Sequence, residues 1–175
     1  MYHLREVNRQ DMNTINKWRN KKELIDTLCA PYRYINFEVD QAWFDDYMKS
    51  RNGTVRCAIV NDNDNNAILG LVSLTSINSI NKTASLHIMI GDKSNQEKGI
   101  GTFAVRELIK HAFSNLNLHR IELGVLNYNT RAIHLYEKIG FKKEGIKRQA
   151  VFKNGDYHDL IIMGLLKDEF NIYIL

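Results

Sequence analysis

The fold is decided at Gln96-Glu97-Lys98-Gly99-Ile100-Gly101, where a short strand gives way to a long helix. The residues before it, Ala84 to Ile90, end in β-forming side chains. Glycines let the backbone approach a ligand closely, because no Cβ stands in the way. A helix start also offers unpaired N–H groups and the positive end of the helix dipole. This strand, turn and helix therefore predict an anion site, most often one for phosphate. The helix is indicated by apolar residues at helical spacing, at Ile100, Ala104, Leu108, Ala112 and Leu116.

Two common nucleotide motifs are excluded by the residues around this turn. A P-loop needs Gly-Lys-Ser/Thr at a fixed spacing, and no such tripeptide follows. The dinucleotide fingerprint needs a third glycine, where this sequence has Ala104. From these six residues alone, a phosphate site and a bare strand-to-helix turn are about equally well supported.

A second motif runs from Asn127 to Phe141 and follows a predicted strand, Arg120 to Leu126. Asn129 or Thr130 can cap a short helix there. Gly140 is placed to end that helix in a left-handed conformation. The apolar face of the helix consists of Ala132, Leu135, Tyr136 and Ile139. The sequence thus predicts a second strand–helix unit directly after the first.

The two motifs together resemble the GNAT family of N-acetyltransferases. The resemblance is carried by Gln-x-x-Gly-x-Gly and by an Asn before a helix reading Ala-Ile-His-Leu-Tyr-Glu-Lys-Ile-Gly-Phe. It is close from Ser85 to Phe141, and the order of elements fits over nearly the whole chain. The family implies an α/β fold of mixed, α+β-like type with helices on both faces of a central mixed sheet. It also implies that this sheet is splayed between its fourth and fifth strands, in a single domain covering residues 1–175.

The remaining elements follow from local patterns, in an order that fits this fold. Asn20 to Asn36 is expected to be a loop, Asn61 to Asn66 a polar turn, and Asn154-Gly155 the turn of a hairpin. Helices are predicted from Asp11 or Asn13 through Arg19 and from Val39 to Ser50, and a surface-packed tail from Asp168 to Leu175. The other strands are predicted at Tyr2 to Val7, Arg56 to Val60, Ile68 to Ile77, Thr83 to Ile90, Phe141 to Phe152 and Tyr157 to Leu166.

Composition limits the classes of partner. The 175 residues are 44% hydrophobic and 25% charged, and no apolar run approaches the roughly 20 residues of a membrane span. The net charge of +4 suits a polyanionic small ligand as well as nucleic acid, but no basic cluster is interleaved with aromatics. We therefore expect neither a membrane nor a nucleic-acid partner. Cys29 and Cys57 form no disulfide or metal pattern, which indicates no metal and a cytoplasmic location.

The resemblance implies acetyl-CoA as co-substrate and assigns its binding residues. The turn would hold the pyrophosphate on backbone N–H groups, with Gln96 also donating from its side chain. Asn129 would contact the CoA arm as well as cap its helix. The pantetheine would pair with the open edge of the strand that ends at Ile90, where an N–H of Ile88 or Met89 would polarise the thioester oxygen. The full predicted set is Ile88, Met89, Ile90, Gln96, Lys98, Gly99, Ile100, Gly101, Asn127 and Asn129.

Acetyl transfer needs an acid and a base. The resemblance makes Tyr136 the acid for the leaving thiolate, although helical spacing alone favours a core tyrosine. Family members often carry a Glu where this sequence has Ser85, so a carboxylate base is not expected there. His87 is one candidate base, because its pKa range suits the task. Glu122 on the neighbouring strand is another, and a water relay is a third alternative.

The acceptor amine is left open among three classes. Trp18, Arg19, Asn20 and Tyr32 form a candidate acceptor site, because Trp-Arg-Asn resembles family members that act on amino-sugar nucleotides. Spermidine acetyltransferases are also similar, including Asn117 to His119, and carboxylates for a polyamine are available at Glu38, Asp40, Asp45 and Asp46. Ribosomal-protein N-terminal acetyltransferases are the third class. A module that binds acyl-CoA without turnover stays an alternative, and the family makes a homodimer plausible.

Overall fold

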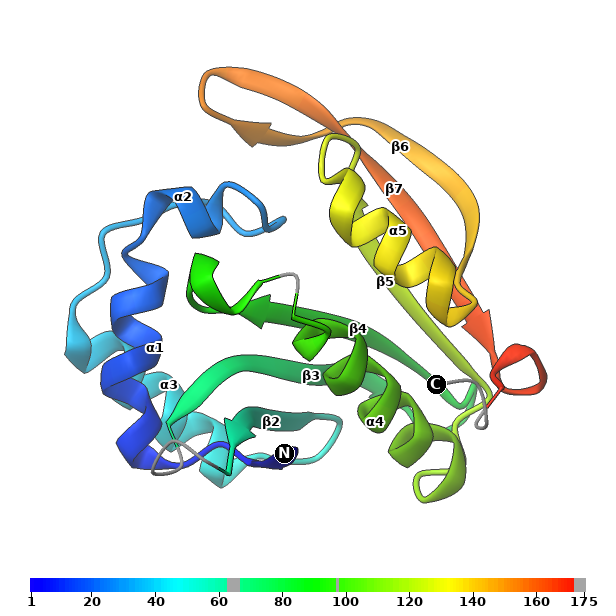
Figure 1. The fold of residues 1–175 in the computed structure, drawn as a ribbon, viewed down its shortest axis with the longest axis horizontal. Helices are drawn as coiled ribbons and strands as arrows, with labels where there is room; N and C mark the ends of the chain where they lie inside the picture. Colours follow the sequence, from blue (N-terminus) through cyan, green and yellow to red (C-terminus); the bar gives the residue numbers. More distant parts are fainter. Residues whose placement is uncertain (63–66, 97, 172–175) are drawn as a thin grey trace.

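The computed structural model describes residues 1–62, 67–96 and 98–171, in which one mixed sheet forms the centre of the molecule (Figure 1). Its strand order is β1-β2-β3-β4-β5-β7-β6. The strands are β1 (Tyr2–Glu6), β2 (Val55–Asn61), β3 (Ile68–Asn78), β4 (Thr83–Ile90), β5 (Arg120–Leu126), β6 (Lys142–Lys153) and β7 (Asp156–Leu166). The helices are α1 (Met12–Arg19), α2 (Lys22–Ile25), α3 (Phe37–Lys49), α4 (Ile100–Ser114) and α5 (Thr130–Ile139), with 3-10 turns at Arg9–Asp11, Lys93–Asn95 and Lys167–Glu169.

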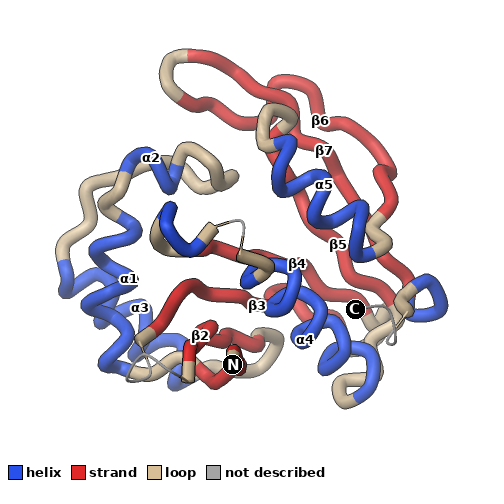
Figure 2. The backbone as a smooth tube through the Cα atoms, in the orientation of Figure 1, coloured by secondary structure: helices blue, strands red, loops and turns tan. Residues whose placement is uncertain are grey.

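The sheet is splayed between β4 and β5. These two strands are parallel and pair only at their beginnings, from Thr83 opposite Arg120 to Ser85 opposite Glu122. Beyond this point β4 stays paired with β3 as far as Ile90, and β5 stays paired with β7 as far as Leu126. Figure 2 shows the two strands diverging, each attached to its own half of the sheet. The predicted fold class, with its splay between the fourth and fifth strands, is therefore confirmed.

Helices cover both faces of the sheet because the strands alternate their apolar residues. On β2, Ile59 points into a core shared with α4 and α5, whereas Ala58 and Val60 point into a second core shared with α1 and α3. Each face thus buries an amphipathic helix pair, and the core under α4 and α5 includes strands from both halves of the splayed sheet. Within the described ranges, none of the helices combines the length and apolar character needed to cross a bilayer.

The N-terminal connection differs most from the sequence prediction. The segment Asn20 to Asn36 was expected to be a loop, but it contains the four-residue helix α2. This helix has no side-chain cap at its N-terminus and buries Leu24 and Ile25 in the fold, so tertiary packing forms it rather than a local signal. Helix α3 begins at Phe37 because Asn36 caps it, accepting a hydrogen bond from the backbone N–H of Val39 at 3.1 Å.

The C-terminal hairpin follows the prediction closely. Asn154 and Gly155 have φ angles of 52° and 93°, the left-handed geometry that a two-residue Asn-Gly hairpin turn needs. In the predicted tail, Phe170 is buried against Phe113, with ring centroids 5.8 Å apart. Residues 172–175 of that tail, and residues 63–66 of the predicted polar turn, lie outside the described residues.

Candidate active site

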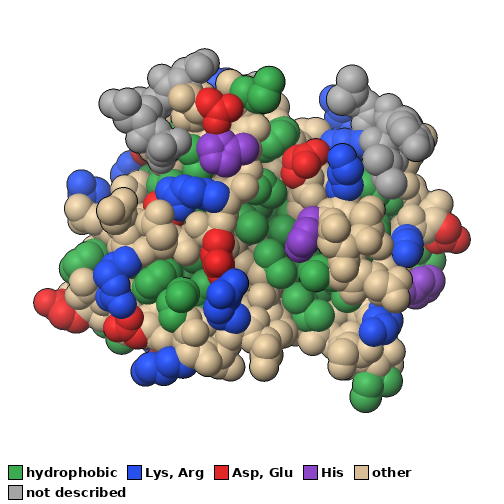
Figure 3. Space-filling view, turned by 90° about the horizontal axis from the view of Figure 1, so that it is seen from below, with side chains coloured by type: hydrophobic (Ala, Val, Ile, Leu, Met, Phe, Trp, Pro, Cys, Tyr) green, Lys and Arg blue, Asp and Glu red, His purple; other side chains and the backbone are tan. Residues whose placement is uncertain are grey.

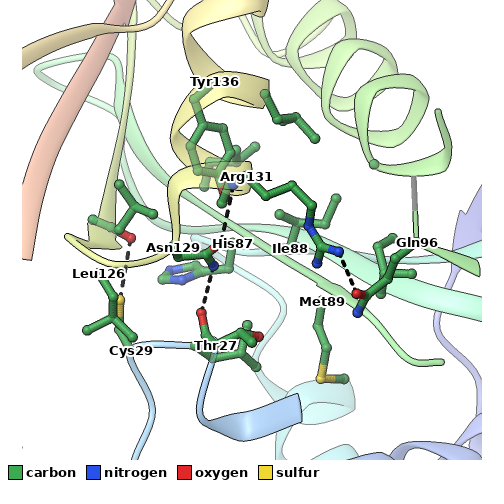
Figure 4. Close-up of a pocket in the computed structure, with 18 of the residues that line it drawn as sticks. Thr27, Cys29, His87, Ile88, Met89, Gln96, Leu126, Asn129, Arg131 and Tyr136 are labelled. Atoms are coloured by element: carbon green, nitrogen blue, oxygen red, sulfur yellow. Dashed lines mark hydrogen bonds between the residues drawn. The ribbon is translucent and has the colours of Figure 1, made fainter. Parts of the chain in front are cut away.

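A cleft of about 930 Å³ opens where β4 and β5 part. A volume of this size accommodates a large organic ligand. Its walls are β4, β5, the starts of α4 and α5, and the segment that follows α2 (Figure 4). The lining includes Thr27, Leu28, Cys29, Ala30, Ser73, His87, Ile88, Met89, Ile90, Gln96, Gly99, Gly101, Thr102, Gly124, Asn129, Arg131, His134, Tyr136 and Lys138.

The start of α4 forms one end of the cleft. Gly99 occupies the N-cap position with a φ of 77°, and no side chain caps the helix. A Cβ at Gly101 would come within 3.0 Å of Leu135 Cδ1 on α5, so glycine lets the two helices approach here. The uncapped N–H groups suit a phosphate. Of the predicted turn residues, Gln96, Gly99 and Gly101 line the cleft, whereas Lys98 is exposed outside the lining and the Ile100 side chain is buried in the core.

Two cations near this end were not predicted from the sequence. Arg131 and Lys138, both on α5, line the cleft together with Gln96. Arg131 Nη1 donates to Gln96 Oε1 at 2.6 Å, which links the start of α5 to the turn before α4 (Figure 4). Positive charge beside a helix start strengthens an anion site. The position of Arg131 two residues after the capping Asn129, in the first turn of α5, was the available sequence signal.

The start of α5 differs from that of α4, because the side chain of its N-cap residue accepts a hydrogen bond from the first turn of the helix. Asn129 Oδ1 accepts a hydrogen bond from the backbone N–H of Ala132 at 3.2 Å, so the predicted cap is confirmed. Its Nδ2 donates to the carbonyl of Thr27 at 2.9 Å. Asn127 lies just outside the cleft lining, and its backbone N–H donates to the carbonyl of Asp159 at 3.1 Å.

Tyr136 lines the cleft and is only 7% exposed. Its ring packs edge-on against Phe141, with centroids 5.7 Å apart. Among the described residues, no hydrogen-bond partner is found for its hydroxyl. Burial, together with the nearby Cys29 thiol, raises the pKa of Tyr136 well above its usual range. The phenol therefore stays protonated and can act only as a proton donor at neutral pH.

His87 lines the same cleft on β4. Its Nε2 lies 2.9 Å from Thr75 Oγ1 on β3. Desolvation at the cleft wall, and secondly the positive charge of Arg56, lower the pKa of His87. The imidazole is therefore neutral at pH 7 and able to accept a proton.

The other candidate base lies elsewhere. Glu122 is on the exposed face of β5, and its carboxylate lies 3.6 Å from Arg120. It does not belong to the cleft lining. Ser85, directly opposite Glu122 in the last β4–β5 pair, is also outside the lining. The geometry thus brings His87, and not Glu122, into the same cleft as Tyr136.

The four residues predicted to bind the acceptor do not line the cleft, and each contacts other parts of the N-terminal half. They are Trp18, Arg19, Asn20 and Tyr32. Trp18 is 2% exposed, and its ring covers Gly91 so closely that a Cβ there would lie 1.9 Å from it. Arg19 forms an ion pair with Asp40, which is fully buried. Asn20 Nδ2 donates to the carbonyl of Ile35 at 2.7 Å, and Tyr32 donates to the carbonyl of Asn20 at 3.3 Å.

The carboxylates considered for a polyamine are also mostly paired. Asp40 binds Arg19, Asp45 binds Arg9, and Asp46 lies 3.2 Å from Lys49. Glu38 is exposed in the first turn of α3. None of the described residues that line the cleft is acidic.

No group of three or more His, Cys, Asp and Glu side chains is arranged to hold a metal ion within the described residues. On the face shown in Figure 3, the coloured Lys and Arg side chains are scattered among acidic and apolar ones.

Comparisons with known proteins agree with this geometry. The family model of the acetyltransferase (GNAT) domain matches residues 2–142. The spermidine N(1)-acetyltransferase of Vibrio cholerae is 31% identical over 95% of this chain and 94% of its own length. YdaF of Bacillus subtilis, named as a candidate ribosomal N-acetyltransferase, is 36% identical over 59% of this chain and 56% of its own. A crystal structure of the Vibrio cholerae spermidine N-acetyltransferase with CoA and spermine superposes with a TM-score of 0.89 at 28% identity, covering 96% of each chain.

The family match and the likeness over nearly the whole chain identify this protein as an acetyl-CoA-dependent N-acetyltransferase. The chain belongs to the GNAT family of acetyltransferases.

Proposed function

We propose that this enzyme acetylates a primary amine of a small molecule, with a polyamine such as spermidine as the favoured acceptor. The observation that carries the proposal is the full-length likeness to a spermidine N-acetyltransferase, at a TM-score of 0.89 over 96% of both chains. An amino-sugar nucleotide is less favoured, because Trp18 is buried and Arg19 is engaged by Asp40. Neither side chain is then available to stack on a base or bind a diphosphate.

The residues of the cleft fit acetyl-CoA. The uncapped start of α4, with Gly99 and Gly101, would hold the pyrophosphate, aided by Arg131 and Lys138. The unpaired edge of β4, at Ile88 to Ile90, would hydrogen-bond the pantetheine and polarise the thioester oxygen. When bound, acetyl-CoA supplies an acetyl thioester whose sulfur leaves as a thiolate.

Two side chains would move the protons. His87 would accept a proton from the attacking amine, because its lowered pKa keeps the imidazole neutral. Tyr136 would donate its hydroxyl proton to the thioester sulfur as the bond between that sulfur and the acetyl carbon breaks. A phenol with so high a pKa transfers its proton only in concert with bond cleavage, so a correct placement of Tyr136 matters more than its acidity.

A second candidate acceptor is the α-amine of a protein. It is favoured by the absence of carboxylates among the described cleft residues, because a polycation needs negative partners. An α-amine has a pKa of about 8, below that of a polyamine near 10, and needs less help to lose its proton. The partial likeness to YdaF points in the same direction.

The test is release of CoA thiol from acetyl-CoA with four acceptors: spermidine, a 4-amino-sugar nucleotide, a peptide with a free α-amine, and an N-acetylated peptide that contains lysine. We expect the highest kcat/KM with spermidine. A higher value with the α-amine peptide would select the second candidate. Binding of acetyl-CoA without turnover of any amine would contradict both and favour a binding module.

The organisation of the protein is part of the same proposal. We infer a single catalytic domain over residues 1–175, a cytoplasmic location suggested by the free thiols of Cys29 and Cys57, and a homodimer suggested by the family. Light scattering of the purified chain would contradict the dimer if it gave a mass near 20.4 kDa.

A further inference from the structure

The segment Ile25–Ala30 leaves the N-terminal half of the molecule and forms a wall of the cleft. Its residues Thr27, Leu28, Cys29 and Ala30 all belong to the lining. In Figure 1 this segment, which follows α2, extends toward the start of α5 and the β6–β7 hairpin. It therefore reaches across the open end of the splay, opposite the short β4–β5 pairing that closes the other end.

The contacts of this wall are made with the C-terminal half. Tyr128 donates from its hydroxyl to the carbonyl of Asp26 at 2.6 Å, and Asn129 Nδ2 donates to the carbonyl of Thr27 at 2.9 Å. The Cys29 thiol donates to the carbonyl of Gly124 on β5 at 3.5 Å. Each of these bonds joins residues about a hundred positions apart, so the wall exists only in the complete fold.

Lys153 holds both ends of the segment at once. It is the last residue of β6, next to the hairpin turn, and it is only 4% exposed. Its Nζ donates to the carbonyl of Ile25 at 2.8 Å and also to the carbonyl of Ala30. A single ammonium group thereby closes the six-residue segment into a fixed turn.

A buried lysine in this position needs an explanation, because burial of a charge is unfavourable unless hydrogen bonds compensate for it. Burial lowers the pKa of Lys153, while Asp26 and Cys29 nearby partly offset that effect. The two carbonyls are the compensation, and they would lose their partner if the ammonium were removed.

The wall lies at the reacting end of the cleft. Cys29 and Tyr136 line the same cleft, and Cys29 is, after burial, the second cause of the raised pKa of that phenol. The pyrophosphate would lie at the Gln96 turn. Figure 4 shows Thr27 and Cys29 on the side of the cleft away from that turn. The acceptor amine must approach at this end, since the thioester sulfur is to be placed beside Tyr136.

We propose that Lys153 is a positioning residue for acetyl transfer, which holds Ile25–Ala30 in place as the acceptor-side wall of the cleft. This inference rests on the proposed function for the identity of the site. It assigns to Lys153 an effect on acceptor binding, with little effect on CoA binding or on the chemical step.

The test compares Lys153→Met with Lys147→Met, an exposed lysine on the same strand. Methionine keeps the apolar stem and removes the donors. We expect Lys153→Met to raise hydrogen exchange of the amides of residues 26–30 and the acceptor KM each about tenfold, the equivalent of one lost charge-assisted hydrogen bond. The CoA dissociation constant from calorimetry and kcat should change less than about threefold, and Lys147→Met should match the wild type.

Two outcomes would overturn the proposal. One is unchanged exchange of residues 26–30 in Lys153→Met. The other is faster exchange with an unchanged acceptor KM, because the wall would then be structural only. Lys153→Gln keeps an amide donor, so it should recover part of the lost protection and of the acceptor KM. It also replaces the methionine variant if that variant does not fold. The exchange measurement needs no substrate, so it remains informative even if the proposed acceptor is wrong.

Discussion

Helices α4 and α5 begin beside the same cleft, but they begin in opposite ways. At α4, Gly99 adopts a left-handed conformation and no side chain caps the first turn. At α5, Asn129 caps the first turn with its own side chain. The start of α4 is thus left open for a ligand, whereas the start of α5 is satisfied by the protein. Helix α5 contributes side chains to the cleft instead, with Arg131, Lys138 and Tyr136.

This difference suggests that the start of α4 serves mainly to bind CoA, and that Tyr136 on α5 serves proton transfer. If it is correct, changes at the start of α4 reduce CoA affinity, whereas changes at Tyr136 and at the Asn129 cap of α5 reduce turnover and stability, respectively. Four predictions test this separation, from the largest expected effect to the smallest.

Tyr136→Phe should reduce kcat by about 10²- to 10⁴-fold, the range expected when a general acid is lost. CoA affinity and melting temperature should stay near wild type, because phenylalanine keeps the contact with Phe141. Steady-state kinetics and calorimetry measure the two effects, with the exposed Tyr157→Phe as control. Unchanged turnover would show that α5 does not provide the acid.

Gly101→Asp should weaken CoA binding by at least about 100-fold. A Cβ at this position would press on Leu135, and the carboxylate would repel the phosphate. Calorimetry with CoA measures the loss. Gly145→Asp on β6 is the matched control, since a Cβ there meets nothing within 4 Å. CoA affinity equal to that of the wild type would remove the pyrophosphate from the start of α4.

The dependence of kcat/KM on pH tests whether His87 on β4, the strand that leads to α4, is the catalytic base. If His87 is the base, kcat/KM falls as pH falls through the pKa of His87, because the protonated imidazole cannot accept a proton. Arg56 lowers that pKa, so Arg56→Met should shift this acidic limb to higher pH. His87→Ala should abolish the limb, and the exposed His111→Ala should leave it in place. A limb unmoved by both His87→Ala and Arg56→Met would exclude His87.

Asn129→Ala should cost about 1 kcal/mol of unfolding free energy, the usual effect of a lost helix cap. For a chain of this length that lowers the melting temperature by about 2–4 °C. Lys98→Ala, at the uncapped start of α4, has no cap to lose and should leave the melting temperature within about 1 °C of the wild type. Equal losses in the two variants would mean that the helix starts do not differ as described.

The parts of the fold that could be predicted from the sequence are those with local signals. The glycine turn, the Asn cap of α5 and the Asn-Gly hairpin each determine backbone geometry within a few residues. The family resemblance added the splay, which no local pattern contains. Tyr136 and His87, the residues assigned as acid and base, both line the cleft.

The acceptor side could not be predicted because it depends on long-range contacts. Trp18, Arg19 and Asn20 are residue types that often bind ligands. In this fold they instead pack on Gly91, pair with Asp40 and donate a hydrogen bond to the carbonyl of Ile35, respectively. Helix α2 and the wall formed by Ile25–Ala30 carry no periodicity of their own. Their positions are set by Lys153, Tyr128 and Asn129, more than a hundred residues later.

The unpaired edge of β4 has an evolutionary consequence. Backbone amides are the same for nearly every amino acid, so a donor site built from main chain tolerates side-chain replacement along the strand. The proposed acceptor side depends on particular side chains, such as Lys153, that hold Ile25–Ala30 in place, so it would be more sensitive to replacement. If Ile25–Ala30 is the acceptor-side wall, as proposed, a few substitutions in this segment would exchange one amine for another, while the acetyl donor would stay the same.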